Sequence, residues 1–219
     1  MKRLIDLSHS IEHGLITYKG LPAPIICDFL SREDSRSHYA DGTTFHIGKI
    51  EMVANTGTYI DSPFHRYANG KDLSELALES IADVECMLFR VASGSRAIGP
   101  ELFSDADVRG KAVLVQTGWA VHWGTDQYFE NHPYLTAAAA AWLKNAGAVL
   151  VGIDSLNIDD ISTGERPVHS TLLAADIPIV EHMCNLEALP DAPFRFHAVP
   201  VKVKQFGTFP VRAYAIVEE

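Results

Sequence analysis

Residues 148–183, AVLVGIDSLNIDDISTGERPVHSTLLAADIPIVEHM, contain the pattern that decides the fold. AVLVGID (148–154) and IPIVEHM (177–183) are short apolar runs rich in β-branched residues, which predicts two buried strands. Between them, VHSTLLAAD (168–176) follows Pro167 and predicts a helix, because proline suits the first helical turn. A strand, a helix and a second strand in this order predict a right-handed crossover and a parallel sheet.

The same alternation begins earlier in the chain. KAVLVQT (111–117) predicts another buried strand. LTAAAAAWLKNA (135–146) predicts a helix, with Thr136 as its N-cap and Gly147 as its left-handed stop. The central architecture is therefore expected to be a β-α-β-α-β unit, and the fold class to be α/β.

Weaker patterns predict elements on both sides of this unit. Residues 45–54 and 84–92 are predicted strands, residues 73–82 are a predicted short helix, and AVPVKVKQF (198–206) and PVRAYAIVE (210–218) alternate as sheet strands do. No repeat, linker or change of composition marks a boundary along the sequence. We therefore expect residues 1–219 to form a single domain with a partly parallel core and additional strands.

Composition narrows the class of function. The chain is 47% hydrophobic with a net charge of -10, which argues against nucleic acid and anionic membranes as partners. The N-terminus has no apolar core of a signal peptide, and no apolar run approaches the length of a membrane span. Three widely spaced cysteines, Cys27, Cys86 and Cys184, indicate buried thiols in a reducing compartment. We expect a cytoplasmic protein with a small-molecule substrate.

The segment NTGTYIDSPFHR (55–66) is the richest in chemistry. If it is extended, the side chains of Asn55, Tyr59 and Asp61 project from one face, because strand side chains alternate with period two. Pro63 then ends the strand and lets His65 fold back towards the same face. The pattern predicts a polar stripe of amide, phenol and carboxylate; a surface edge strand entering a turn would give the same composition.

These residues also resemble a known signature. Residues 55–65 are similar to H-x-G-T-H-x-D-x-P-x-H of the cyclase family, which contains bacterial kynurenine formamidase, and they match it at Gly57, Thr58, Asp61, Pro63 and His65. Further similarities follow in family order over nearly the whole chain, at residues 6–9, 152–155, 167–169, 179–181 and 210–213. The resemblance implies the swivelling β/β/α fold of this family and a homodimer or homotetramer.

The resemblance also implies metal ligands and an acid–base residue. Relatives hold divalent metal, usually zinc and sometimes manganese, and by position the ligands here are Asp61, His169 and Glu181. His65 matches the signature histidine that moves protons. Both remaining signature histidines are replaced, by Asn55 and Tyr59, and a neutral amide or a protonated phenol is a poor zinc ligand. The expectation is one divalent metal ion, zinc or manganese, or none.

The leading hypothesis is a metal-dependent hydrolase that acts on a small-molecule amide or lactone. His65, Asp61 and Tyr59 are the predicted catalytic residues, with Tyr59 or Asn55 donating a hydrogen bond to the developing oxyanion. Asn55 and His46 are predicted to contact the substrate. Because the signature departs where the family's formamidases carry metal, a substrate other than N-formylkynurenine is expected.

Two alternatives fit the same residues. The first is a metal-independent cyclase, dehydratase or isomerase that uses His65, Tyr59 and Asp61 as acid–base groups. The second is a homologue that binds a small molecule and has no turnover. Insensitivity to chelators with loss of activity in His65→Ala favours the first, and tight binding without turnover favours the second.

Overall fold

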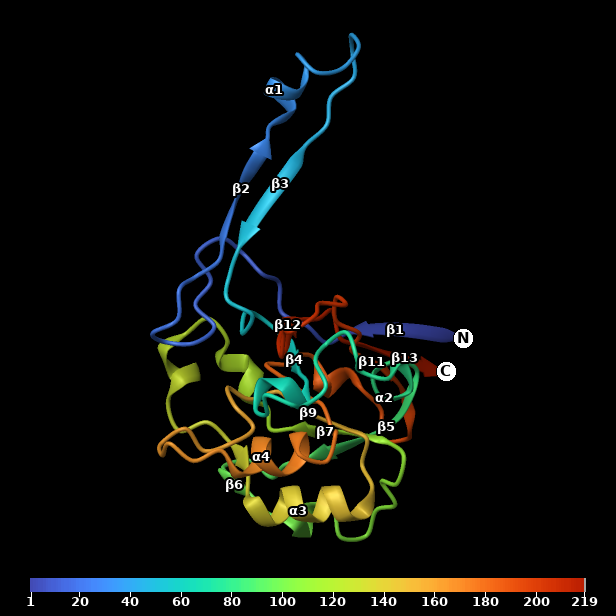
Figure 1. Cartoon of the computed structure of the whole chain (residues 1–219). Coiled ribbons are helices and arrows are strands. Elements are labelled where there is room, and N and C mark those ends of the chain that lie inside the picture. Colours follow the sequence, from blue (N-terminus) through green and yellow to red (C-terminus); the bar gives the residue numbers. More distant parts are fainter. Residues whose placement is uncertain (219) are drawn as a thin grey trace.

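The computed structural model describes residues 1–218, and a nine-stranded mixed sheet dominates it (Figure 1). The early and late thirds of the sequence both contribute strands to this sheet, so residues far apart in the chain lie side by side. The strands run in the order β1 (Lys2–Asp6), β13 (Tyr214–Glu218), β11 (Phe194–His197), β5 (Val84–Arg90), β7 (Ala112–Gln116), β9 (Leu150–Ile153), β10 (Ile179–Glu181), β4 (Tyr59–Asp61) and β12 (Thr208–Pro210).

The predicted β-α-β-α-β unit is confirmed. Strands β5, β7, β9 and β10 are parallel neighbours, and α3 (Ala137–Ala146) and α4 (Pro167–Leu173) are the crossover helices. The Thr136 side chain accepts a hydrogen bond from the backbone of Ala139 at 3.2 Å. Gly147 has a φ of 84° and ends α3, as the sequence predicted.

Side chains from the two faces of the central strands enter two separate cores. In β7, Val113 and Val115 pack with the apolar faces of α3 and α4, whereas Ala112 and Leu114 belong to the core on the opposite face. This alternation follows from the period-two geometry of a strand. Both faces of the parallel strands are therefore covered, and their sequences are continuous apolar runs for that reason.

The remaining elements are short. One further short helix and a pair of two-residue strands lie around the sheet, with 3-10 turns in the connections: α2 (Leu78–Ile81), β6 (Ala97–Ile98), β8 (Tyr134–Leu135), η1 (Pro63–His65), η2 (Pro100–Leu102), η3 (Trp119–His122), η4 (Asp126–Phe129) and η5 (Leu186–Ala188). Among residues 1–218, no helix has the length and apolarity needed to cross a bilayer.

Three predictions about local structure need correction. The predicted helix 73–82 forms only over α2, and the extended stretch 55–61 is interrupted because Gly57 has a φ of 66°. A Cβ at Gly57 would lie 2.9 Å from the Ile11 side chain. Both this close approach and the positive φ favour glycine at this position. The predicted strand 198–206 is wrong: this segment is an exposed loop, and the sheet resumes at Thr208.

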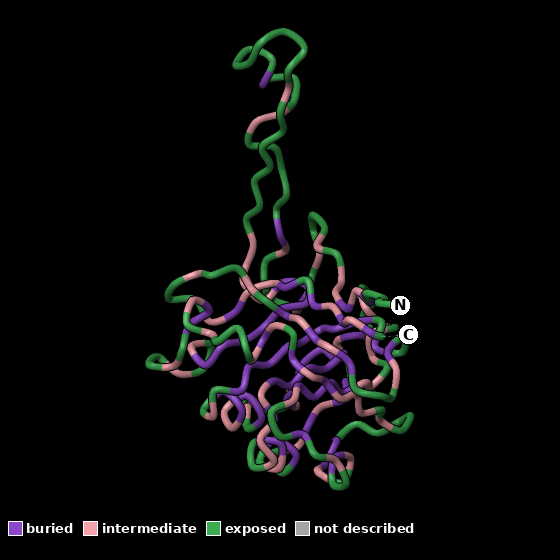
Figure 2. Tube along the Cα trace, turned by 90° about the vertical axis from the view of Figure 1, so that its right-hand side faces the viewer, coloured by how far each residue is buried: buried purple, intermediate pink, exposed green. Residues whose placement is uncertain are grey.

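A long ribbon, which we call the arm (residues 25–51), leaves the body of the molecule (Figures 1 and 2). It consists of β2 (Ile25–Leu30) paired antiparallel with β3 (Ile47–Glu51), and of α1 (Arg32–Ser35) near its tip. The predicted strand at 45–54 is therefore real but lies outside the main sheet. Of the residues in the arm, only Ser35 is buried.

The ring of His9 stacks on Trp123, with the ring centroids 4.0 Å apart and an interplanar angle of 5°. Burial lowers the pKa of His9 from 6.5 to about 4. Since the folded-state pKa lies below the unfolded one, the unfolded chain binds the extra proton between these values. This contribution to stability is present above pH 6.5 and is lost as the pH falls towards 4.

We therefore expect the free energy of unfolding, measured by urea titration, to decrease between pH 6.5 and 4.5 less steeply in His9→Phe than in the unaltered protein. Phenylalanine keeps the stack on Trp123 but cannot be protonated. His38→Phe, at an exposed position of the arm, should leave the pH dependence unchanged. Equal slopes in His9→Phe and the unaltered protein would show that His9 does not titrate as described.

Candidate active site

A pocket of about 310 Å³ opens on the side of the sheet where β4 and β10 meet. It lies near the carboxyl end of β10, where open α/β sheets bind their ligands. Polar side chains from four separate parts of the sequence line it: Tyr18, Asn55, Tyr59, His65, Arg66, Asn157, Arg166, His169 and Glu181, together with Leu21.

Strand pairing places the central residues. Strand β4 lies between β10 and β12, with Tyr59 opposite Glu181 and Asp61 opposite Thr208. Paired residues point to the same face of a sheet, so the phenol, both carboxylates and the hydroxyl are directed to one side. Asp61, Glu181 and Tyr59 are all almost completely buried.

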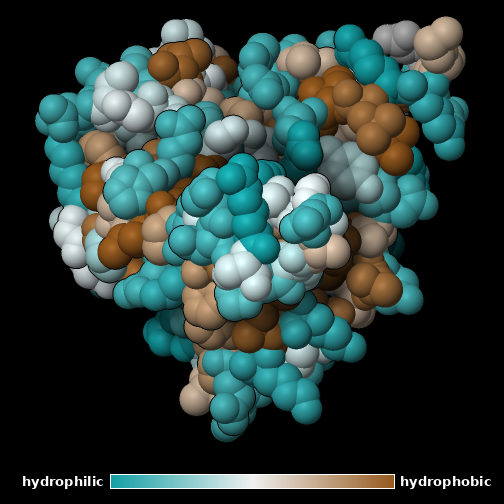
Figure 3. Space-filling model, turned by 90° about the horizontal axis from the view of Figure 1, so that it is seen from above, coloured by the Kyte–Doolittle hydropathy of each residue, from teal (hydrophilic) through white to brown (hydrophobic). Residues whose placement is uncertain are grey.

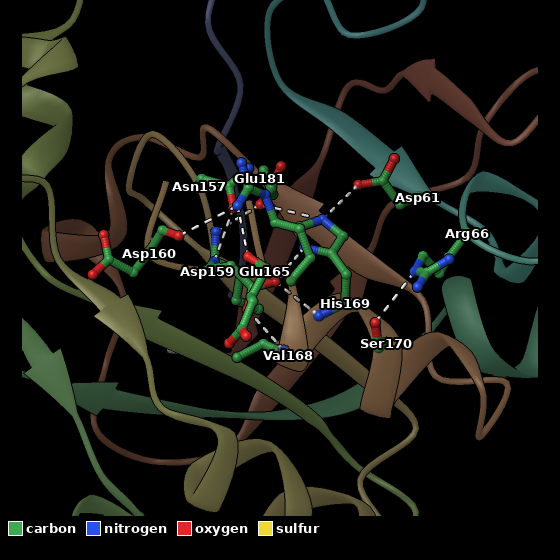
Figure 4. Close-up of polar contacts among 12 residues, drawn as sticks. Asp61, Arg66, Asn157, Asp159, Asp160, Glu165, Val168, His169, Ser170 and Glu181 are labelled. Carbon is green, nitrogen blue, oxygen red and sulfur yellow. Dashed lines mark hydrogen bonds and ion pairs between the residues drawn. The ribbon is translucent and has the colours of Figure 1, made fainter. Parts of the chain in front are cut away.

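Three potential metal ligands converge beside the pocket (Figure 4). His169 Nε2 lies 3.6 Å from Asp61 Oδ2 and 3.7 Å from Glu181 Oε1. Asp61 Oδ2 is buried and has no hydrogen-bond partner within residues 1–218. A buried carboxylate oxygen without a donor carries a large desolvation cost, which a bound cation would offset. The predicted ligands are thus together, and their chemistry fits a divalent cation.

Asp159 fixes the orientation of His169. Its carboxylate accepts hydrogen bonds from the backbone N–H of Val168 and His169, at 2.7 and 2.9 Å, and from His169 Nδ1 at 2.6 Å. Nδ1 therefore donates its proton to Asp159, and Nε2 is turned towards Asp61 and Glu181. A carboxylate behind the histidine is the usual support of a metal-binding imidazole.

The electrostatics of the cluster also favour a cation. Burial opposes a charge on His169, but Glu181, Asp159 and Asp61 outweigh it and raise the pKa of His169 to about 10. Burial raises the pKa of Glu181 as well. Both groups hold protons more tightly than they would in water, because three carboxylates surround one imidazole in a dry setting. The site has an excess of negative charge.

His65 lies beside these groups, held by a hydroxyl. Its Nδ1 is 2.7 Å from Thr208 Oγ1, and the Thr208 hydroxyl donates in turn to Asp61 Oδ1. Since that hydroxyl proton is directed at Asp61, the Thr208 oxygen accepts the proton of His65 Nδ1. In the neutral imidazole the other nitrogen, Nε2, is then the acceptor, and His65 lines the pocket. This is the arrangement of a general base.

Tyr59 has a different role from the histidine that it replaces. Its hydroxyl donates to Glu181 Oε2 at 2.7 Å and lies 3.3 Å from His182 Nε2. Burial, and then the charge of Glu181, raise the pKa of Tyr59 well above its usual value, so the phenol stays protonated. Its proton is committed to Glu181, and the predicted oxyanion role does not suit Tyr59.

The structure places the two residues predicted to contact the substrate in different parts of the molecule. Asn55 lines the pocket, and its side chain has no hydrogen-bond partner among the residues described, so it can face a ligand. His46 does not line the pocket, and the prediction for it is wrong. Its Nε2 pairs with Asp28 at 2.8 Å within the arm, because the strand before the signature leaves the body instead of joining the sheet.

Several residues of the site were not predicted. Arg66 and Arg166 flank signature positions in the sequence, directly after His65 and directly before Pro167, and this adjacency was the available signal. Tyr18 and Asn157 join the site through a hydrogen bond of 2.7 Å between Asn157 Nδ2 and the Tyr18 hydroxyl. Only the three-dimensional structure places Asp159, Thr208 and His182 there.

The sequence of this chain is similar to a family profile and to characterised relatives. Residues 5–160 match the sequence profile of the Cyclase family, described as "Putative cyclase". Kynurenine formamidase of Geobacillus thermodenitrificans is 29% identical over 215 residues, covering 97% of each chain. Kynurenine formamidase of Bordetella avium is 28% identical over 216 residues, again covering 97% of each chain.

Solved structures agree on the fold. A potential metal-dependent hydrolase with cyclase activity superposes with a TM-score of 0.82 at 23% identity, covering 100% of both chains. Isatin hydrolase A from Labrenzia aggregata has a TM-score of 0.83 at 20% identity, covering 100% of this chain and 94% of that one. The chain belongs to the cyclase family and is an enzyme.

Two overlapping donor sets could hold the cation. One is Asp61, His169 and Glu181; in the other, His65 takes the place of Glu181, and its ligand atoms lie within 4.8 Å of those of Asp61 and His169. We expect about one Mn²⁺ or Zn²⁺ per chain by elemental analysis, with Glu181→Gln weakening the affinity at least about 100-fold. His65→Ala should retain the metal. If His65→Ala loses the metal and Glu181→Gln retains it, the ligands are instead Asp61, His65 and His169.

Proposed function

We propose that this enzyme hydrolyses an amide or lactone bond of a small molecule, with one divalent cation held by Asp61, His169 and Glu181. The observation that carries the proposal is the convergence of these three groups beside His65 in one pocket. The names of the relatives, kynurenine formamidase and isatin hydrolase, support hydrolysis as the reaction class. Zinc and manganese both suit a set of carboxylate and imidazole ligands.

The cation would supply charge that the side chains lack. When bound, it would polarise the scissile carbonyl group and acidify the attacking water. The protein's own contribution is to hold the ligands in place: Asp159 behind His169, Tyr59 and the backbone N–H of Ile158 on Glu181, and Thr208 on Asp61. Each ligand is thus fixed by a second hydrogen bond, which keeps the site preorganised.

His65 moves the proton. In the neutral imidazole, Nε2 of this pocket-lining residue can accept a proton from the attacking water, while Nδ1 donates to Thr208. Once protonated, His65 is stabilised through Thr208 by the negative charge of Asp61, whose Oδ1 lies 3.6 Å from Nδ1. The same proton can then pass to the leaving nitrogen or oxygen, as acid–base catalysis of acyl transfer requires.

Asn55 is the better candidate for contact with the reacting carbonyl group. Its amide N–H groups are not used elsewhere within residues 1–218, whereas the hydroxyl proton of Tyr59 is bound to Glu181. A neutral donor near the carbonyl oxygen stabilises the charge that develops on it.

Two guanidinium groups in the pocket favour a substrate that carries a carboxylate. Arg66 is anchored by Nε on Ser170 at 3.2 Å, and Arg166 by Nη1 on backbone carbonyls, the nearest being that of Glu165 at 2.6 Å. Their remaining N–H groups have no partner among the described residues. Paired N–H donors of arginine match the geometry of a carboxylate.

Activity should depend on the hydroxyl that orients His65. Using a panel of small amides and lactones, we expect His65→Ala to lower kcat by roughly 10²–10⁴-fold, since a positioned base contributes that much. Thr208→Val should lower kcat about 10-fold or more, because it removes the acceptor that fixes the imidazole tautomer, and Thr208→Ser should restore it. Full activity in Thr208→Val would exclude this orienting role.

The substrate preference should depend on the arginines. We expect kcat/KM for a substrate with a carboxylate to be at least about 10-fold higher than for its neutral carboxamide analogue. A hydrogen bond to a charged group contributes about 1.5–3 kcal/mol, which corresponds to at least this factor. Arg166→Met should abolish most of this preference, whereas Arg109→Met, at an exposed position on another part of the surface, should not. If the unaltered enzyme, Arg166→Met and Arg109→Met all show the same ratio of kcat/KM for the two substrates, Arg166 does not bind a substrate carboxylate.

The competing metal-independent reaction makes an opposite prediction about chelators. Protein stripped of metal should lose activity and regain it with Mn²⁺ or Zn²⁺ if the cation is required; full activity of metal-free protein supports acid–base chemistry by His65 and Asp61 alone.

We further propose the cytoplasm as the compartment, since Cys27, Cys86 and Cys184 are all unpaired thiols, and a single domain as the functional unit.

A further inference from the structure

The residue after the proposed ligand Glu181 has an unusual backbone conformation. His182 directly follows β10 and has a φ of 55°, in the left-handed region that glycine adopts freely and other residues adopt at a cost. Its carbonyl oxygen accepts a hydrogen bond from the hydroxyl of Thr58, and the residue is completely buried. A strained, buried and polar residue next to a functional side chain is a candidate for a role in the site.

Two buried phenols hold the ring of His182. The Tyr128 hydroxyl lies 2.9 Å from Nδ1, and the Tyr59 hydroxyl lies 3.3 Å from Nε2. At most 1% of the surface of each of these three residues is accessible, so none of them contributes to the mixed polar and apolar surface that Figure 3 shows. Because the ring pairs with two hydroxyls and not with a carboxylate, a positive charge on it would be costly, and the imidazole is neutral.

The direction of each hydrogen bond follows from the carboxylate at one end. The Tyr59 hydroxyl donates its proton to Glu181 Oε2 at 2.7 Å, so its oxygen can only accept from His182. Nε2 therefore carries the proton of the neutral imidazole, and Nδ1 accepts the proton of Tyr128. Tyr128, His182 and Tyr59 thus form a chain of hydrogen-bond donors that ends at Glu181, which we call the donor chain.

The neighbouring hydroxyl of Tyr18 does not take the place of His182. It lies 3.4 Å from the Tyr59 hydroxyl, but it donates to the carbonyl oxygen of Leu156 at 2.6 Å. Among residues 1–218, His182 is therefore the donor that the Tyr59 oxygen has. Hydrogen bonds in a chain polarise one another, so loss of His182 would weaken the bond from Tyr59 to Glu181 as well.

The aromatic segment of residues 119–129 fixes the outer end of the donor chain. Trp119 Nε1 donates to the backbone carbonyl oxygen of Tyr128 at 3.0 Å. The ring of Trp123 lies edge-on to those of Tyr128 and His182, with centroid distances of 5.1 and 5.7 Å. Edge-to-face packing of this kind holds the rings in fixed orientations. A segment without a part in the mechanism is thus connected, through Tyr128, to a proposed cation ligand.

We propose that His182 and Tyr128 are positioning residues, which act through Tyr59 to hold Glu181 in the orientation that binds the cation. This role rests on the proposed function, in which Glu181 is a cation ligand. Glu181 Oε1 accepts a hydrogen bond from the backbone N–H of Ile158 at 2.6 Å, and the donor chain fixes the other oxygen, so both oxygens of the carboxylate are held. Hydrogen bonds behind a ligand typically contribute about 10–100-fold to metal affinity.

The first experiment is calorimetric titration of the metal-stripped protein with Mn²⁺. His182→Leu removes the donor to Tyr59 and should weaken Mn²⁺ binding about 10-fold, whereas His182→Gln, whose amide can donate from a similar position, should restore most of the affinity. Both variants bear the same backbone cost, so the difference between them reports the hydrogen bond. His197→Leu, at a half-buried histidine of β11 outside the pocket, is the matched control and should bind Mn²⁺ as the unaltered protein does.

A double-mutant cycle tests whether His182 acts through Tyr59. Tyr59→Phe should weaken Mn²⁺ binding at least as much as His182→Leu does, and the combination of both should bind no more weakly than Tyr59→Phe alone. Tyr128→Phe removes a single oxygen, keeps the packing of the ring and should weaken binding about 2-fold or more, as loss of a neutral hydrogen bond would. It tests the same role if circular dichroism shows that His182→Leu does not fold.

The tautomer of His182 can be measured without metal or substrate. In protein labelled with ¹⁵N-histidine, the signal of His182 is assigned by its absence from His182→Gln. We expect NMR to show that Nε2 is protonated and that Nδ1 is not. Because this measurement concerns the metal-free protein, its result does not depend on the proposed cation.

Three results would overturn the positioning role. Protonation of His182 at Nδ1 instead of Nε2 would reverse the donor chain. Equal Mn²⁺ affinity in His182→Leu and the unaltered protein would show that the chain does not act on Glu181, and additive losses in the double mutant would show a route that bypasses Tyr59. Unaltered protein that binds neither Mn²⁺ nor Zn²⁺, but has the expected tautomer, would instead contradict the cation of the proposed function, so the two failures are distinguishable.

Discussion

The antiparallel pairing of β10 with β4 is the constraint on which the site depends. It sets Glu181 opposite Tyr59, and Ile179 opposite Asp61, although these residues are more than half the chain apart. A shift of one residue would turn Glu181 to the other face of the sheet and separate it from Asp61. Apolar neighbours fix the register, because Ile60 and Val180 both enter the same core.

Charge decides what this geometry can do. Asp61, Asp159 and Glu181 are buried around a single imidazole, and buried carboxylates need protons, donors or a cation. Asp159 is satisfied by the helix α4 and His169, and Glu181 by Tyr59 and Ile158, which leaves Asp61 Oδ2 without a donor. At the position of a signature histidine, Tyr59 instead donates to Glu181, one of the three ligands in our proposal of a single cation.

The sequence predicted those parts of the structure that short-range patterns control. Buried strands and the ends of α3 were correct because apolar runs, Thr136 and Gly147 act locally. The family resemblance predicted Asp61, His169 and Glu181 as ligands, and the structure brings these three side chains together. Asp159 and Thr208 could not be predicted, since their roles arise from pairing across the sheet and from the loop before α4. His46 and the loop 198–206 were misjudged because their strand-like patterns concern surfaces outside the main sheet.

The pairing of β4 with β10 and β12 brings the proposed cation ligands and the proton-transfer group to one point of the molecule. The most direct test is an anomalous-difference map from crystals of protein purified without chelator. We predict one strong peak bounded by Asp61, His169 Nε2 and Glu181, with His65 outside the ligand sphere. A map without a peak there, from protein that retains full activity, would contradict the central claim.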